Sequence, residues 1–120
     1  MAWGSKTTAT QLTAITTTEL FFDQTPIINP GEFHHVEIEA NPPATPTDDL
    51  RVSIYGTLDD SSENWDDTPR MVFIIDSGTD PNKKSFIISG IYKYRIGVVV
   101  DGATDTYVAD MSFRADGVNL

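Results

Sequence analysis

The chain has 120 residues, no cysteine, and 18 acidic against 8 basic side chains, so its formal net charge is -10. This length favours one domain, and the lack of cysteine excludes disulfide bonds and thiolate metal sites. The negative charge repels phosphate backbones and anionic lipids, so we expect no nucleic-acid or membrane partner. Residues 1–10 lack the features of a secretory signal, which predicts synthesis in a cytoplasm.

The N-terminal segment is rich in threonine and poor in large apolar residues. Threonine favours an extended backbone but supplies little apolar area for burial. We therefore predict a loosely anchored arm over residues 1–10 and a single domain over residues 11–120. A first strand is expected between Thr10 and Phe22.

The next segment begins with a turn at residues 29–31, where proline presets its own φ and glycine accepts a positive φ. From residue 32 the side chains alternate, which predicts a half-buried strand with an acidic wet face. One face carries His34, Val36, Ile38 and Ala40, and the other carries His35, Glu37 and Glu39. The two histidines point to opposite faces, so they cannot bind one metal together.

Two further strands are predicted on either side of an acidic loop. Residues 50–58 alternate between apolar and polar side chains, after a proline-rich surface loop. Residues 71–75 are apolar on both faces, which is typical of a central strand or of a strand covered by another element or subunit.

The rest of the chain also reads as short strands separated by turns, over residues 85–89, 92–100 and 106–115. No window has a convincing helical stripe. The sequence therefore predicts an all-β fold: an antiparallel β-sandwich, jelly-roll or immunoglobulin-like, with seven or eight strands and an extended N-terminal arm.

The acidic loop is the first candidate for chemistry. An EF-hand loop needs a central glycine and flanking helices, whereas this stretch lacks the glycine and is flanked by predicted strands. We predict a solvated hairpin tip with no bound metal or cofactor, and keep weak calcium binding as the alternative. The candidate calcium ligands are Asp59, Asp60, Glu63, Asp66 and Asp67.

No catalytic residues are predicted. The chain lacks a G-x-S-x-G nucleophile motif, a phosphate-binding loop and any cysteine nucleophile. Pairs of carboxylates, which a glycosidase needs, arise by chance in so acidic a chain. The expectation is that the protein is not an enzyme.

Several side chains are candidates for partner contacts: Trp3, Leu12, Ile15 and Trp65. An exposed Trp65 could anchor a protein interface or stack on a sugar, with Tyr55 and Tyr92 completing the platform. The alternative is that Trp65 folds back over the end of the sandwich as a lid on the core.

Three stretches of the chain resemble small virion proteins of tailed phages: MAWGSKTTATQLTAITTTE, DDLRVSIYGTLDDSSENWDDTPRMVFIID and MSFRADGVNL. Within that group the chain is most similar to capsid decoration, or cement, proteins. The resemblance implies a non-enzymatic protein that binds the major capsid protein on the outside of the head and stabilises the shell. It also implies a homotrimer located in the virion and made in the host cytoplasm. The alternatives are a carbohydrate- or receptor-binding module of the tail or head surface, and a tail or neck component.

Overall fold

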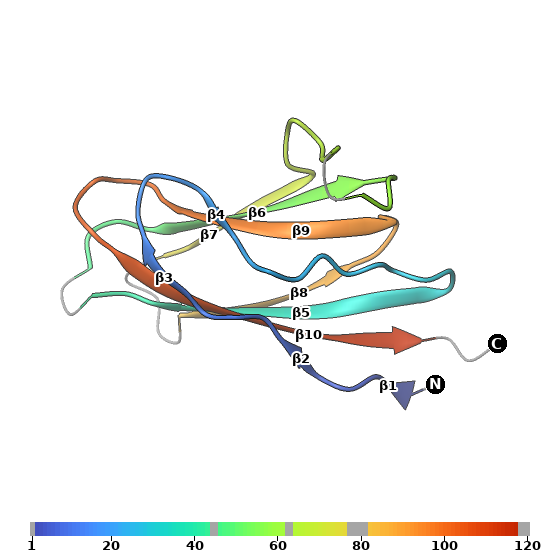
Figure 1. Ribbon diagram of the computed structural model, residues 1–120. Helices are drawn as coiled ribbons and strands as arrows, with labels where there is room; N and C mark the ends of the chain where they lie inside the picture. Colours follow the sequence, from blue (N-terminus) through green and yellow to red (C-terminus); the bar gives the residue numbers. More distant parts are fainter. Residues whose placement is uncertain (1, 44–45, 62–63, 77–81, 118–120) are drawn as a thin grey trace.

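Two antiparallel β-sheets face each other, and the chain passes repeatedly between them (Figure 1). The computed structural model describes residues 2–43, 46–61, 64–76 and 82–117. No helix in this part of the chain is long and apolar enough to cross a membrane. The strands, in chain order, are β1 (Ala2–Trp3), β2 (Thr7–Thr8), β3 (Leu12–Ile15), β4 (Leu20–Phe21), β5 (Glu32–Asn41), β6 (Leu50–Thr57), β7 (Met71–Ile75), β8 (Lys83–Ile88), β9 (Lys93–Val100) and β10 (Tyr107–Gly117).

The strand order is that of a jelly roll. Sheet A has the order β1-β10-β5-β8, with β2 and β3 also paired to β10, and sheet B has the order β4-β9-β6-β7. Within these sheets β3 pairs with β10, β4 with β9, β5 with β8, and β6 with β7. The chain from β3 to β10 is therefore one long rolled-up hairpin, which defines a jelly roll. The predicted β-sandwich is confirmed, and the immunoglobulin-like alternative is not the form observed.

The core lies between the two sheets and follows the predicted alternation. In β5 the side chains of His34, Val36 and Ile38 are buried, while His35 is exposed on the outer face. Leu58 departs from the prediction, because it lies beyond the end of β6 and is 82% exposed. Among the described residues, the buried apolar side chains that pack together in the core are Ala9, Ile15, Phe22, Ile28, Val36, Ile38, Ala40, Leu50, Val52, Ile54, Ile75, Ile88, Tyr94, Ile96, Val98, Val100, Tyr107, Ala109 and Met111.

The turn at residues 29–31 forms as predicted. Gly31 has a φ of 79°, and the N–H of Glu32 donates a hydrogen bond of 3.0 Å to the carbonyl oxygen of Asn29. Proline before a glycine of positive φ is the arrangement of a type II turn. This turn sets the start of β5.

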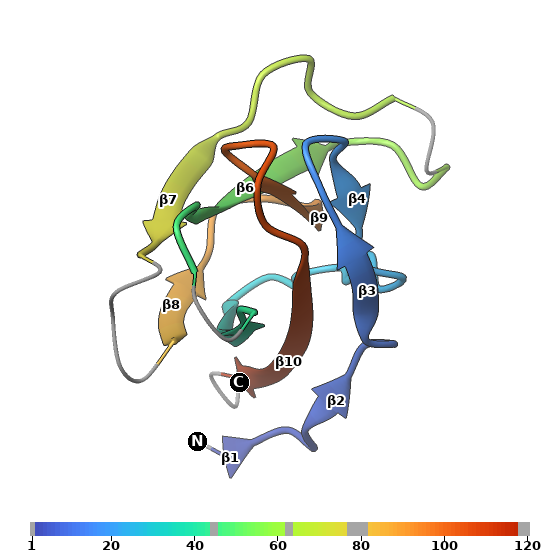
Figure 2. The same cartoon turned by 90° about the vertical axis from the view of Figure 1, so that its left-hand side faces the viewer.

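The N-terminal arm lies along β10 at the edge of sheet A (Figure 2). The N–H of Gly4 donates to the carbonyl oxygen of Ala115 at 2.7 Å, and the N–H of Ala9 donates to that of Met111 at 2.9 Å. From Gly4 to Thr8 the side chains are exposed or half-buried. The arm is thus held mainly through its backbone, and its boundary at residue 10 stays a prediction.

A strand is found between Thr10 and Phe22 as predicted, but it is not the first in the chain, and a second strand lies in the same segment. This segment forms two strands, β3 in sheet A and β4 in sheet B, so it crosses from one sheet to the other. Near the crossing Ala14 has a φ of 53°, in the left-handed region that residues with a Cβ rarely adopt. Ala14 lies inside β3 where the register against β10 shifts, so its positive φ accompanies a β-bulge, and the break between β3 and β4 falls at residues 16–19.

Strand β7 lies at the edge of sheet B, so its prediction as a central strand is wrong. It pairs with β6 on one side, and no strand among the described residues pairs with it on the other. Three of its side chains, Met71, Val72 and Ile74, are exposed. The alternative, that another subunit covers β7, is compatible with this position.

Replacing Ala14 with glycine is expected to stabilise the fold by roughly 0.5–1 kcal/mol, because glycine adopts a positive φ without steric strain. Urea unfolding of the variant should show a higher midpoint at an unchanged slope. Thr13→Gly is the matched control in the same strand, since Thr13 is not among the residues of positive φ. It is expected to be destabilising, and equal destabilisation by both changes would contradict the strain at Ala14.

Candidate functional site

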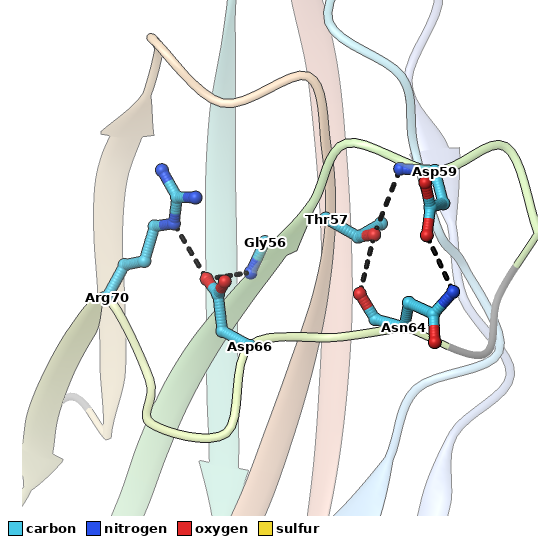
Figure 3. Close-up of polar contacts among 6 residues, drawn as sticks. All are labelled: Gly56, Thr57, Asp59, Asn64, Asp66 and Arg70. Carbon is cyan, nitrogen blue, oxygen red and sulfur yellow. Dashed lines mark hydrogen bonds and ion pairs between the residues drawn. The ribbon is translucent and has the colours of Figure 1, made fainter.

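The acidic loop that follows β6 is folded back onto the end of that strand (Figure 3). The carboxylate of Asp66 accepts a hydrogen bond of 3.1 Å from the backbone N–H of Gly56 and one of 2.7 Å from Nε of Arg70. The N–H of Asp66 donates in turn to the carbonyl oxygen of Gly56 at 3.0 Å. One carboxylate therefore ties both ends of the loop to β6.

A second set of hydrogen bonds closes the tip of the loop (Figure 3). The hydroxyl of Thr57 donates to the carbonyl oxygen of Asn64 at 2.7 Å and accepts from the N–H of Asp59 at 3.1 Å. The side-chain amide of Asn64 donates to the carboxylate of Asp59 at 2.7 Å. Polar groups of the loop are therefore hydrogen-bonded to one another and to Thr57 at the end of β6.

The calcium alternative finds no support in the described residues. Among them, no group of three or more His, Asp or Glu side chains is placed to hold a metal ion. Asp66 binds Arg70, and Asp60 accepts a hydrogen bond from the hydroxyl of Tyr92. The remaining candidate, Glu63, lies outside the described residues.

The environment of Asp66 changes its acidity. The hydrogen bond from Arg70 is the main reason why the pKa of Asp66 is lowered, and the N–H of Gly56 adds to it, while partial burial opposes both. Hydrogen bonds to a carboxylate favour its ionised form. The loop contact is therefore strongest when Asp66 is charged.

A cluster of aromatic side chains surrounds Arg95 on sheet B, and we name it the Arg95 cluster: Phe21, Tyr55, Trp65 and Arg95. The guanidinium carbon lies 3.8 Å from the ring centroid of Phe21, 4.9 Å from that of Trp65 and 5.7 Å from that of Tyr55. Cation–π contacts of this kind are attractive, and more so where water is excluded. The cluster joins β4, β6, β9 and the acidic loop.

Two further features define the chemistry of the Arg95 cluster. Partial burial lowers the pKa of Arg95, and the nearby Glu19 opposes this shift. Glu19 accepts hydrogen bonds of 2.9 and 3.1 Å from the hydroxyl of Tyr55. The Nε of Arg95 is buried and has no hydrogen-bond partner. The guanidinium of Arg95 therefore lies among aromatic rings, and its Nε–H donates no hydrogen bond to any described residue.

The sugar platform predicted from Trp65, Tyr55 and Tyr92 forms only in part. Trp65 is half-buried, and it and Tyr55 both contact Arg95. Tyr92 instead donates its hydroxyl to Asp60, and this hydrogen bond raises the pKa of Tyr92. Two of the three aromatic side chains therefore lie around the guanidinium of Arg95, which was not part of the predicted platform.

The other predicted contact residues lie apart from Trp65. Ile15 is fully buried in the core, so the prediction that it contacts a partner is wrong for the folded domain. Leu12 is half-buried and packs against the core. Trp3 pairs with Asp116 through its backbone, and its side chain lies outside the described part of the structure.

Sequence reasoning missed a clasp at one end of the sandwich. The carboxylate of Asp105 accepts from the N–H groups of Thr47 and Asp48 at 2.6 and 2.7 Å. The carboxylate of Asp48 accepts from those of Thr104 and Asp105, each at 2.9 Å. These backbone donors lower the pKa of Asp105, whereas burial and the nearby acids raise that of Tyr107 to about 12. The abundance of Asp in the two loops was the available signal.

Two open hollows lie on the described surface. One, of about 260 Å³, lies beside the arm and is lined by Lys6, His35, Glu37, Ser112, Phe113 and Arg114. The other, of about 390 Å³, lies around the turn at residues 29–31, with Ile27, Glu32 and Tyr92 in its lining. The first hollow includes the acidic residue Glu37 and the second includes Glu32.

Comparisons with known proteins bear on the fold. No protein-family model matches the chain, and no curated protein matches it. A solved structure that is similar comes from Bacillus endospore appendages, a family of disulfide-linked pili. The two chains are 13% identical with a TM-score of 0.53, over 98% of this chain and 88% of the other. At this identity the likeness shows that the two proteins share a fold.

Replacing Asp66 with asparagine is expected to cost roughly 1 kcal/mol at neutral pH, because two hydrogen bonds lose their charged acceptor in a partly exposed site. Because the pKa of Asp66 is lowered in the folded state, its stabilisation is complete above about pH 4 and is lost as the pH falls through the folded pKa. Urea unfolding of the variant and the parent protein should therefore show a difference in the free energy of unfolding that becomes smaller at acid pH.

Asp67→Asn is the matched control, since Asp67 is an exposed neighbour in the same loop. It should change the free energy of unfolding by less than about 0.5 kcal/mol. The role given to the Asp66 carboxylate would be contradicted if the free energies of unfolding of Asp66→Asn and the parent protein differed by the same amount at low pH.

Proposed function

We propose that this chain is a structural protein of a phage particle, a decoration protein that binds the major capsid protein on the outer surface of the head. The observation that carries the proposal is the arm. Residues 4–8 lie along β10 through backbone contacts and bury none of their described side chains. An extended terminal segment that is held mainly through its backbone can leave β10 and reach a neighbouring subunit.

The fold supports a structural role. The chain is similar to a protein from pili, which are assemblies. Its own assembly could not use disulfide links, because the chain has no cysteine. A network of loop contacts uses Asp48, Asp66 and Asp105 to hold backbone, which favours binding over catalysis as their role.

The mechanism of such a protein is thermodynamic. A protein that binds the assembled shell but not free subunits stabilises the shell by mass action. Repetition of weak contacts over a symmetric surface raises the total effect through multivalency. The net charge of -10 would keep the protein away from packaged DNA.

Deleting residues 1–8 is expected to weaken binding to heads by about tenfold or more while the domain stays folded. The deletion stops before Ala9, whose side chain is buried. The measurement is co-sedimentation with purified heads assembled without this chain, together with thermal unfolding of the free protein. Leu58→Ser, which changes an exposed apolar side chain outside the arm, is the control and should bind as the parent does. If the deletion variant occupied the heads as fully as the parent does, the proposal that the arm binds the capsid would be contradicted.

A carbohydrate-binding role on the head or tail surface is the second candidate, and the Arg95 cluster favours it. Trp65 and Tyr55 lie beside the partly buried guanidinium of Arg95, and sugars are bound by aromatic rings together with polar groups.

On this second candidate, Trp65→Ala should reduce binding on a glycan array by about tenfold or more, because the main aromatic surface is lost. Leu58→Ala, also outside the core, should leave binding unchanged. Absence of any glycan bound by the parent protein would exclude this role.

A further inference from the structure

Strand β7 is an edge strand that lacks the usual protection against pairing with another chain. Exposed edges are normally blocked by lysine, proline, bulges or very short strands. The five residues of β7, MVFII, contain neither charge nor proline, and their pairing with β6 is regular. The backbone groups on the far side of β7 find no strand partner among the described residues.

The side chains of β7 are apolar on both faces of sheet B. Phe73 and Ile75 face the core, and Ile75 is buried. Val72 and Ile74 lie opposite Ser53 and Arg51 and are 48% and 42% exposed. A strand that is apolar on both sides is typical of the interior of a sheet, so the pattern of β7 conflicts with its place at an edge.

The neighbouring edge strand, β8, is protected in the usual way. It begins with Lys83 and Lys84, and both side chains are exposed. Phe86 of β8 packs edge-to-face on Phe73 of β7 at 4.7 Å between ring centroids. This contact joins β7 to sheet A, and the two strands lie next to each other in Figure 2.

The charges at the two ends of β7 select one kind of partner. Arg70 precedes the strand and Asp76 follows it. If a second copy of β7 pairs antiparallel about Phe73, Arg70 of each copy lies opposite Asp76 of the other, where opposite charges attract. A parallel arrangement would place like charges together. The apolar segment also carries no charge that would repel a second copy of a chain whose net charge is -10.

We propose that two copies of this chain associate through antiparallel pairing of β7 with β7 about a twofold axis at Phe73. The two copies of sheet B, of four strands each, then form one continuous sheet. Such an interface is isologous, the commonest kind in homo-oligomers. The interface consists of two paired strands of 5 residues each. Stable interfaces bury about 800 Å² on each partner, so we expect so short a pairing to give a weak dimer.

Sedimentation equilibrium of the full chain, at concentrations from about 10 μM to 1 mM, tests the proposal over the range suited to a weak interface. The parent protein should reach the mass of two chains. Val72→Lys/Ile74→Lys, which adds edge lysines at exposed positions, should remain a monomer with an unchanged circular dichroism spectrum. Leu58→Lys is the control and should dimerise like the parent. A parent that stays monomeric, forms trimers, or dimerises equally with the two lysines would overturn the proposal.

A pair of charge variants tests the register even if the lysine variant does not fold. Asp76→Arg alone and Arg70→Asp alone should each weaken self-association by about tenfold, because like charges then meet across the twofold. Mixing the two variants should restore association, since each Arg then faces an Asp. Arg70 also contacts Asp66, so the circular dichroism spectrum of each single variant must match that of the parent. Failure of the mixture to associate better than either variant would exclude this register.

The dimer does not rest on the capsid role. A monomeric lysine variant that still binds heads would separate the two, and head binding that fails with an intact dimer would remove only the capsid proposal. A mass of three chains would favour the trimer that the phage resemblance implies and would contradict the β7 interface.

Discussion

Burial of the inner faces of β5, β6, β9 and β10 is the constraint on which the rest of the structure depends. These four strands are the inner strands of the two sheets, and their inward side chains, mostly Val and Ile, make up most of the core. Each such side chain contributes roughly 1.5–3 kcal/mol by leaving water. With no disulfide available, this packing must offset the entropy of ordering the chain. The arm, the loops and β7 are all attached to this frame.

The sequence predicted those parts of the fold that depend on local alternation. Residues 32–40 alternate strictly, and so the buried face of β5 was correctly assigned. The positive φ of Ala14 could not be predicted, because alanine carries no signal for it. The edge position of β7 also escaped prediction, since a run that is apolar on both faces does not say whether its neighbour belongs to the same chain.

The candidate site was predicted less well than the fold because its contacts join distant residues. The acidic loop and Trp65 were identified, but the contact of Trp65 with Arg95 depends on a loop folding over a sheet. Gly97 makes room for this cluster, because a Cβ there would lie 2.7 Å from the carboxylate of Glu19 and 2.8 Å from the ring of Phe21. The acids were counted as surface charge, yet Asp48, Asp66 and Asp105 act as acceptors for backbone N–H groups. Composition gives the number of carboxylates, but only the fold shows what they bind.

The two ends of the described chain meet on one side of the molecule, where Ala2 lies opposite Gly117 across β1 and β10. Strand β8 forms the other edge of sheet A, and β7 contacts it through Phe73 and Phe86. A peptide or domain fused to either terminus would therefore project from the same rim. Such a fusion would leave the edge formed by β7 and β8 free for contacts. The sandwich is therefore suited to carrying a fused peptide at one edge while the other edge binds a partner.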